Sequence, residues 1–110
     1  MAVLKKLGGT GYKPVAATIT ASYTVPGATQ VAITSIVVDN QSTTVADMVR
    51  ICHSPSGTAA AAVDYVWYDK EVPAKGTLQI GSLCAAATDV WRIYSLNGTS
   101  VFNFYGIENP

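Results

Sequence analysis

The sequence has little charge and no charge of one sign in excess. Asp, Glu, Lys and Arg make up 13% of its 110 residues, against about a quarter in an average soluble domain, and the seven basic and seven acidic residues cancel. Without net positive charge there is little counterion release to drive nucleic-acid binding, so we expect no nucleic-acid partner. Much of the surface must consist of Ala, Thr, Ser and Val, and such a surface favours a protein partner.

Long hydrophobic runs are also missing. No window approaches the 18 or more apolar residues of a membrane span, and Gly8, Gly9 and Gly11 interrupt the start before a secretory signal could form. We therefore expect no membrane partner and folding in a cytoplasm. The length suits one domain.

Cysteine and histidine are scarce. Cys52 and Cys84 are too few and too far apart for a disulfide framework or a zinc knuckle, so reduced thiols are expected. The single histidine, His53, adjoins Cys52, and neighbours on a strand point to opposite faces, which makes a Cys–His dyad awkward. Cys84 could approach His53 in space, but nothing in the sequence indicates it. We expect no enzymatic activity, no catalytic residues, no metal site and no cofactor, with His53 half-exposed at a strand end.

Paired carboxylates offer little more. Only Asp69 and Glu71 share a strand face by spacing, and Lys70 and Lys75 lie close enough to neutralise them. The expected role of these charges is to solvate a sheet edge and discourage strand addition. Exposed aromatics could serve a sugar-binding module, but alternation places Tyr65 and Trp67 on one face and Tyr68 on the other, so one set is expected in the core.

Short apolar stretches rich in Val, Ile, Thr and aromatics recur about every ten residues, with turn residues between them. This pattern predicts an all-β protein, a single antiparallel β-sandwich, Ig-like or jelly-roll-like, of about eight strands. The strands are expected at 15–20, 22–25, 31–38, 46–53, 63–72, 77–83, 89–96 and 100–107. Residues 31–38 carry no charge on either face, so a second layer or a neighbouring molecule should cover the outer side. Residues 58–62 are expected to form a surface loop, with an Ala-rich helical turn as the alternative.

Residues 1–13 contain little that could pack by itself. They are expected to form an N-terminal arm, and residues 14–110 the β-sandwich domain.

The last two strands are predicted to form a hairpin. If Asn97-Gly98 is a two-residue turn, opposed residues have numbers that sum to 195, and opposed residues share a face. One face then carries the large pairs Ile93 with Phe102 and Trp91 with Phe104, which is a core face. The other face is amphipathic, as a subunit contact requires. It comprises Val90, Arg92, Tyr94, Val101, Asn103 and Tyr105.

Five segments resemble a family of small bacteriophage virion proteins. They are SYTVPGAT at 22–29, TSIVVDN at 34–40, DYVWYD at 64–69, DVWRIYS at 89–95 and FNFYGIE at 102–108. The resemblance spans about residues 15–109 and preserves order and spacing. Departures at Gly27-Ala28 and Thr88-Asp89 affect turns only. The resemblance implies a β-sandwich accessory subunit that attaches to capsids or tails and has no enzymatic activity.

These observations together predict a bacteriophage structural protein, assembled in the host bacterial cytoplasm and located in the virion. Its expected action is capsid decoration or cementing through contacts with itself, as a homo-oligomer with a trimer as one candidate, and with virion proteins such as the major capsid protein. Leu4, Lys5 and Lys6 of the arm are expected to contribute to these contacts. A tail, neck or fibre subunit and a glycan- or host-binding module on the virion are the alternatives.

Overall fold

The computed structural model describes residues 3–109, which contain nine strands and three short 3-10 turns. The strands are β1 (Val3–Lys6), β2 (Thr20–Thr24), β3 (Gln30–Asn40), β4 (Asp47–Ser54), β5 (Tyr65–Val72), β6 (Thr77–Ile80), β7 (Leu83–Ala85), β8 (Val90–Ser95) and β9 (Ser100–Asn109). The turns are η1 (Leu7–Gly9), η2 (Pro55–Gly57) and η3 (Ala62–Asp64). The helical segments among residues 3–109 are these three-residue turns, and none of them could span a membrane.

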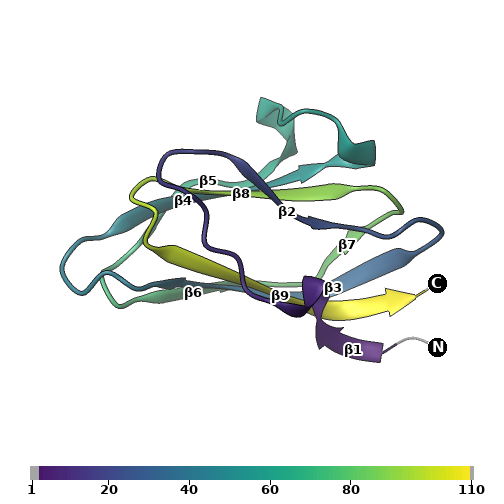
Figure 1. Cartoon of the computed structure of the whole chain (residues 1–110), viewed down its shortest axis with the longest axis horizontal. Helices are drawn as coiled ribbons and strands as arrows, with labels where there is room; N and C mark the ends of the chain where they lie inside the picture. The colour runs from purple at the N-terminus through teal and green to yellow at the C-terminus, as the bar shows by residue number, and fades with distance from the viewer. Residues whose placement is uncertain (1–2, 110) are drawn as a thin grey trace.

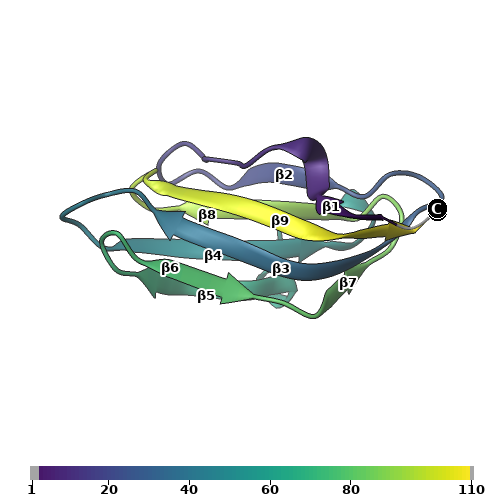
Figure 2. The same cartoon turned by 90° about the horizontal axis from the view of Figure 1, so that it is seen from below.

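The strands form two antiparallel sheets packed face to face. The five-stranded sheet has the order β1-β9-β3-β6, with β7 also paired to β3, and the four-stranded sheet has the order β2-β8-β4-β5. Figure 1 shows the two layers edge-on, and Figure 2 shows the five-stranded sheet from its outer side. The predicted antiparallel β-sandwich is confirmed.

Most of the predicted strands are present, with differences at turns. No strand covers 15–19, because the chain turns at Ala16 and Ala17, where Ala17 has a φ of 54°. The predicted strand at 77–83 is broken into β6 and β7 at Gly81 and Ser82, where Ser82 has a φ of 62°. The short strand β1 was not predicted, and β7 extends two residues beyond the predicted strand, to Ala85. The expected surface loop at 58–62 is confirmed up to η3, which begins at Ala62.

The predicted hairpin between the last two strands is wrong. β8 pairs with β2 and β4, whereas β9 pairs with β1 and β3, so the Asn97-Gly98 turn crosses from one sheet to the other. Asp47 secures this crossing. Its buried carboxylate accepts the N–H of Asn97 at 2.9 Å and the hydroxyl of Ser100 at 2.6 Å, and it also accepts the hydroxyl of Ser95.

The predicted core residues lie in the core despite the wrong pairing. Trp91 and Ile93 of β8 face Phe102 and Phe104 of β9 across the space between the sheets, and all four are at most 1% exposed. The Trp91 and Phe104 rings meet edge to face, with centroids 6.2 Å apart. Alternation sets which way a side chain points, and both strands point their large residues inward whether or not they pair.

The central strand β3 is covered on one side only. Its inward residues, such as Ile33 and Ile36, are fully buried, whereas Ala32 and Thr34 on the outer face are exposed and Val37 is half-buried. The expectation that a second layer of the same chain covers the outer side is therefore wrong. Of the two predicted covers, only a neighbouring molecule remains.

The segment expected to be an arm lies along the edge of the five-stranded sheet. Val3–Lys6 pairs with β9, and Tyr12 exchanges two backbone hydrogen bonds with Phe102, at 2.7 and 2.8 Å. Between them the chain bulges through Gly8 and Gly9, both at positive φ, and this bulge turns Leu7 into the core, where it is fully buried. The amino-terminal segment thus contributes to the hydrophobic core through Leu7.

Candidate functional site

His53 is the natural starting point for a chemical site. It lies near the end of β4, half-buried, as predicted, and opposite Trp91 of β8. Its ring stacks on the Trp91 ring with centroids 4.5 Å apart and planes 7° apart, and its Nε2 lies 2.7 Å from an Asp89 carboxylate oxygen. The histidine is therefore held on one face by an indole and on one nitrogen by a carboxylate.

The Asp89 carboxylate ties three segments together. Besides His53, it accepts the backbone N–H of Ser56 in η2 at 2.9 Å and that of Ala86 after β7 at 3.0 Å. Burial alone would raise the pKa of Asp89, but these two backbone hydrogen bonds and the contact with His53 outweigh it and hold that pKa below its usual value. The arrangement is that of a structural carboxylate that secures loops.

The two cysteines occupy different environments. Cys84 is exposed on β7 and lines, together with His53 and Asp89, an open and largely apolar pocket of about 580 Å³. Cys52 is buried, with its Sγ 3.6 Å from the Ser54 hydroxyl. Within residues 3–109, His53 hydrogen-bonds Asp89 and neither thiol, and no three His, Cys, Asp or Glu side chains are grouped to hold a metal ion.

The amphipathic face predicted for the last two strands does not exist as one surface. Because β8 and β9 belong to different sheets, the outward residues of the two strands lie on opposite sides of the sandwich. Those on the outer face of the four-stranded sheet are Val90, Arg92 and Tyr94. Those on the outer face of the five-stranded sheet are Val101, Asn103 and Tyr105.

Two of the residues on the four-stranded sheet are occupied within the chain. The Arg92 guanidinium donates to the Ser54 hydroxyl at 3.1 Å and to the carbonyl oxygen of Thr58 at 3.2 Å. The η2 turn lies over Val90, since a Cβ on Gly57 would come within 3.6 Å of the Val90 side chain. Arg92 thus fastens the loop after β4 onto the sheet.

The residues predicted on the five-stranded sheet are partly covered by the amino-terminal segment. A Cβ on Gly11 would lie 2.6 Å from the Asn103 side chain and 3.4 Å from that of Val101, so the chain passes directly over both. The Lys6 ammonium lies 5.7 Å from the centre of the Tyr105 ring, a cation–π contact. Leu4, in contrast, is 65% exposed on β1.

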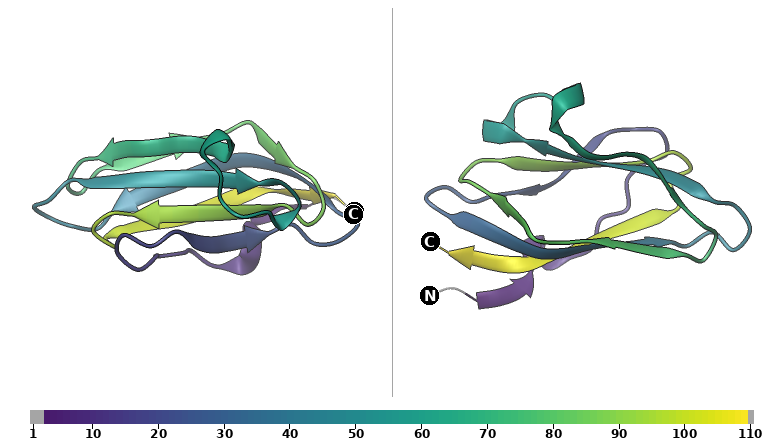
Figure 3. Two further views of the ribbon diagram at one scale, coloured as in Figure 1. Left: turned by 90° about the horizontal axis from the view of Figure 1, so that it is seen from above. Right: turned by 180° about the vertical axis from the view of Figure 1, so that it is seen from behind.

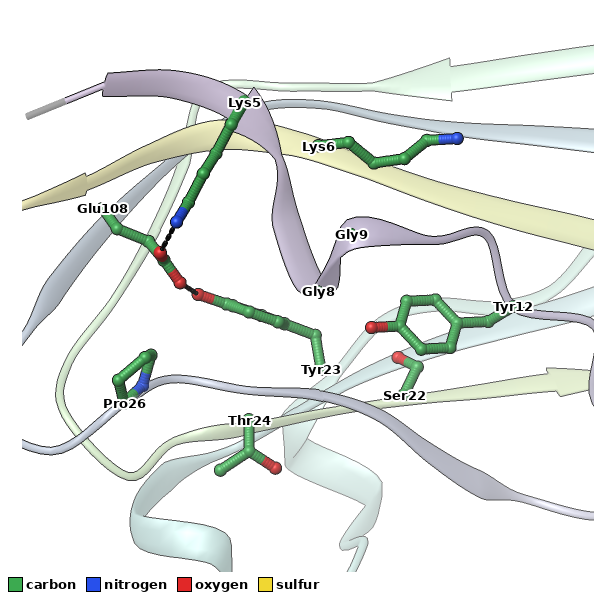
Figure 4. A pocket seen from close by; sticks show the side chains of 10 residues that line it. All are labelled: Lys5, Lys6, Gly8, Gly9, Tyr12, Ser22, Tyr23, Thr24, Pro26 and Glu108. Atoms are coloured by element: carbon green, nitrogen blue, oxygen red, sulfur yellow. Dashed lines mark hydrogen bonds and ion pairs between the residues drawn. The ribbon is translucent and has the colours of Figure 1, made fainter.

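Lys5 belongs to a polar chain at the open side of the sandwich. Its ammonium pairs with Glu108, and the Tyr23 hydroxyl donates to the other oxygen of the same carboxylate (Figure 4). The hydrogen bond from Lys5 holds the pKa of Glu108 below its usual value, and burial raises the pKa of Tyr23 above its own. These three groups line a pocket of about 440 Å³ beside Gly8 and Gly9, and they join β1, β2 and β9.

An arginine stack on the outer face of the four-stranded sheet was missed by the sequence analysis. Arg50 of β4 lies between two aromatic rings, 4.1 Å from the centre of Tyr68 and 4.4 Å from that of Tyr94. It also donates to both carboxylate oxygens of Asp69, at 2.7 and 3.3 Å, which raises the pKa of Arg50. The expected neutralisation of Asp69 by lysines is therefore wrong, since Arg50 neutralises it.

A bulge in β5 makes this stack possible. Asp69 has a φ of 54°, and the pairing of β4 with β5 shifts between Val49 and Ile51, so that Tyr68 and Asp69 both lie beside Arg50. The predicted alternation of the β5 aromatics is also wrong, because the pairing of β4 with β5 shifts a second time, between Ile51, which pairs with Trp67, and Cys52, which pairs with Tyr65. Tyr65 meets Tyr68 edge to face at 5.1 Å.

Exposed apolar side chains extend the stack into a larger surface. Met48, two residues before Arg50 on β4, is exposed, and so is Leu96, which donates its N–H to the Met48 carbonyl oxygen at 2.9 Å. Tyr68 is 60% exposed. We call this surface the platform. It consists of Met48, Arg50, Tyr68, Tyr94 and Leu96.

Searches against models of protein families, against characterised proteins and against solved structures found no match to this chain.

Proposed function

We propose that this chain is a structural subunit that acts through protein–protein contacts, and that it decorates or cements the capsid of a bacteriophage. The proposal that the chain acts through protein–protein contacts rests on the Tyr68–Arg50–Tyr94 stack, which lies on an open sheet face. Tyrosine, arginine and methionine are enriched in interface cores and binding hot spots.

The stack is suited to binding because it is already ordered. Arg50 is held by two rings and by both oxygens of Asp69, so little side-chain freedom remains to be lost when a partner covers it. Asp69 also neutralises the guanidinium, so a partner would not have to bury an unpaired charge. The platform therefore offers apolar area at a low cost in entropy and desolvation.

The virion address rests on the resemblance of the sequence segments between residues 15 and 109. A tail, neck or fibre position is supported by the same contact argument and stays the alternative address. In either place the partners are other copies of the chain and virion proteins such as the major capsid protein, and assembly takes place in the host bacterial cytoplasm.

Leu4 and its neighbours on β1 provide a second contact surface. β1 is a short edge strand, and Leu4 is exposed on its outer side, next to the Lys6 and Tyr105 pair. An edge strand with an exposed leucine is a natural place for another chain to bind. We assign the contact with the particle to this edge.

A glycan-binding module is the alternative from a different class. The exposure of Tyr68 favours it, since sugars pack on open aromatic faces. The guanidinium of Arg50 already covers one face of Tyr68 and one of Tyr94, however, so only their outer faces are open to a ligand. A glycan array is the direct test, and specific hits would favour this alternative.

The proposed function is tested with phage particles assembled without this subunit. We expect the purified protein to co-sediment with these particles in a saturable way and to raise their melting temperature. Separated heads and tails used in parallel distinguish the two addresses. Absence of binding to both would overturn the proposal.

A point substitution tests the β1 edge. Leu4→Asp should weaken particle binding while the protein stays folded, because Leu4 is exposed. Thr77→Asp, on the exposed far edge of the same sheet, is the matched control and should bind normally. A deletion of residues 1–13 is a poor test, since it would also remove Leu7 from the core.

A further inference from the structure

We infer that the platform binds the platform of a second copy of this chain, with the two copies related by a two-fold axis that passes over Arg50. This inference deepens the proposed function and rests on its premise that the chain acts through protein contacts. The argument comes from the charges on the outer face of the four-stranded sheet.

Two opposite charges lie at opposite corners of this face. Glu71 of β5 is directly opposite Met48, whose side chain points outward, and Arg92 of β8 is directly opposite Cys52. Directly opposed residues share a face, and Arg92 lies between the inward-facing Trp91 and Ile93, so both charges belong to the outer side. Neither residue is in an ion pair within residues 3–109.

Arg50 marks the midpoint between the two charges. β4 lies between β5 and β8, and Arg50 lies halfway between Met48 and Cys52 along it. Four residues along the strand correspond to about 13 Å, and two strand spacings correspond to about 10 Å. The central charge is neutralised by Asp69. Arg92, half-buried beside residues 57–58, donates only to uncharged oxygens there and keeps its positive charge, which leaves one acidic corner and one basic corner.

This pattern is complementary to itself. A two-fold contact uses the same patch on both molecules, so the patch must carry both halves of each interaction. When two such faces meet, a two-fold axis that lies in the interface, passes over Arg50 and runs perpendicular to the line from Glu71 to Arg92 places Glu71 of each copy opposite Arg92 of the other. Other charges near the face are Lys70, opposite the inward-facing Val49, and Asp64 in η3.

A protruding segment bounds this face. Residues 55–64 stand out from the outer side of the four-stranded sheet as a wall, in teal in Figure 1 and Figure 3. This wall begins after Ser54, at the basic end of the face, and it carries Val63, which is 91% exposed. The exposed Met48 and Leu96 lie at the acidic end.

Two charge-reversed variants test the inference. The wild-type chain should be a dimer by light scattering at tens of micromolar. Glu71→Arg alone places Arg opposite Arg, and Arg92→Glu alone places Glu opposite Glu, so each variant should self-associate at least about tenfold more weakly. An equimolar mixture of the two should regain association, because both cross-pairs in the mixed dimer are again Arg with Glu.

The controls separate this contact from general effects. Gln79→Arg adds a charge to the outer face of the five-stranded sheet, opposite Val37, and should leave the dimer intact. Because Arg92 also fastens residues 57–58, each variant is checked by circular dichroism and thermal melting. If Arg92→Glu does not fold, Leu96→Asp and Tyr68→Ala replace it, and both should give monomers that melt near the wild-type temperature.

Several results would overturn the inference. They are a wild-type chain that stays monomeric up to about 100 μM, association that these variants leave unchanged, and a mixture that remains dissociated. A monomer that still binds phage particles would refute the two-fold contact and leave the proposed function standing. A dimer that the variants dissociate as described, but that binds no particle, would support the two-fold contact and refute the proposed function.

Discussion

Replacing Leu7 with alanine should destabilise the protein by about 3 kcal/mol. Leu7 is fully buried although it lies in the first turn of the chain, where the η1 bulge directs it between the two sheets. Leucine-to-alanine changes in cores cost about 2.7 to 5 kcal/mol, and a site at the edge of the sandwich can relax, so the lower part of that range applies. The loss is measured by chemical denaturation.

The same change should lower the melting temperature by about 13 °C. Unfolding entropy is about 2.1 cal/mol/K per residue, or about 0.23 kcal/mol/K for 110 residues, and 3 kcal/mol divided by this value gives the shift.

Leu4→Ala is the matched control. Leu4 is on the adjoining strand but 65% exposed, so its loss should change stability by less than about 0.5 kcal/mol. A Leu7→Ala variant that loses less than about 1 kcal/mol, or loses no more than Leu4→Ala, would refute the conclusion that the amino-terminal segment is part of the core.

Three further predictions concern the interior and its polar fastenings. Trp91→Ala and Phe104→Ala should each cost about 3 to 5 kcal/mol in denaturant titrations, and losses under about 1 kcal/mol would contradict their place in the core. Asn40→Ala should cost about 3 kcal/mol in the same assay. The buried amide donates to the buried carbonyl oxygen of Val72, which would be left unpaired, and its own oxygen accepts from the Ser42 N–H and the Thr99 hydroxyl; a loss under about 0.5 kcal/mol would count against this. Asp89→Asn should cost about 1.5 to 3 kcal/mol at pH 7. The native pKa of Asp89 is below its usual value, so the contribution of its carboxylate to stability is present above about pH 4 and is lost as the pH falls through the native pKa. The melting temperature of the variant should therefore fall less steeply in acid than that of the wild type. Parallel curves of melting temperature against pH would contradict the assignment.

The core was largely predictable because side-chain direction on a strand is a local property. Successive residues point to opposite faces, so Trp91 and Ile93 had to share one face of their strand and Phe102 and Phe104 one face of theirs. The half-buried position of His53 at the end of a strand followed from similar local reasoning. These predictions needed no knowledge of which strands pair.

The predicted contact face failed because strand pairing is not local. Asn97-Gly98 favours a tight hairpin, but the Asp47 carboxylate binds Asn97, Ser95 and Ser100 and holds the chain in a crossing between the sheets. The energy of this buried cluster depends on a residue about fifty positions away. The residues of the turn by themselves therefore do not indicate the crossing.

By itself, the sequence determined the all-β class, a single sandwich and most of the residues at its centre, because alternation and turn residues act over a few neighbours. The tertiary structure alone decided that Leu7 joins the core, that β8 and β9 separate, and that Arg50 lies between Tyr68 and Tyr94. The arginine stack joins three strands and depends on the bulge at Asp69. Such a surface exists only after strands with similar patterns have competed for partners, and that choice is made by the summed packing of the whole molecule.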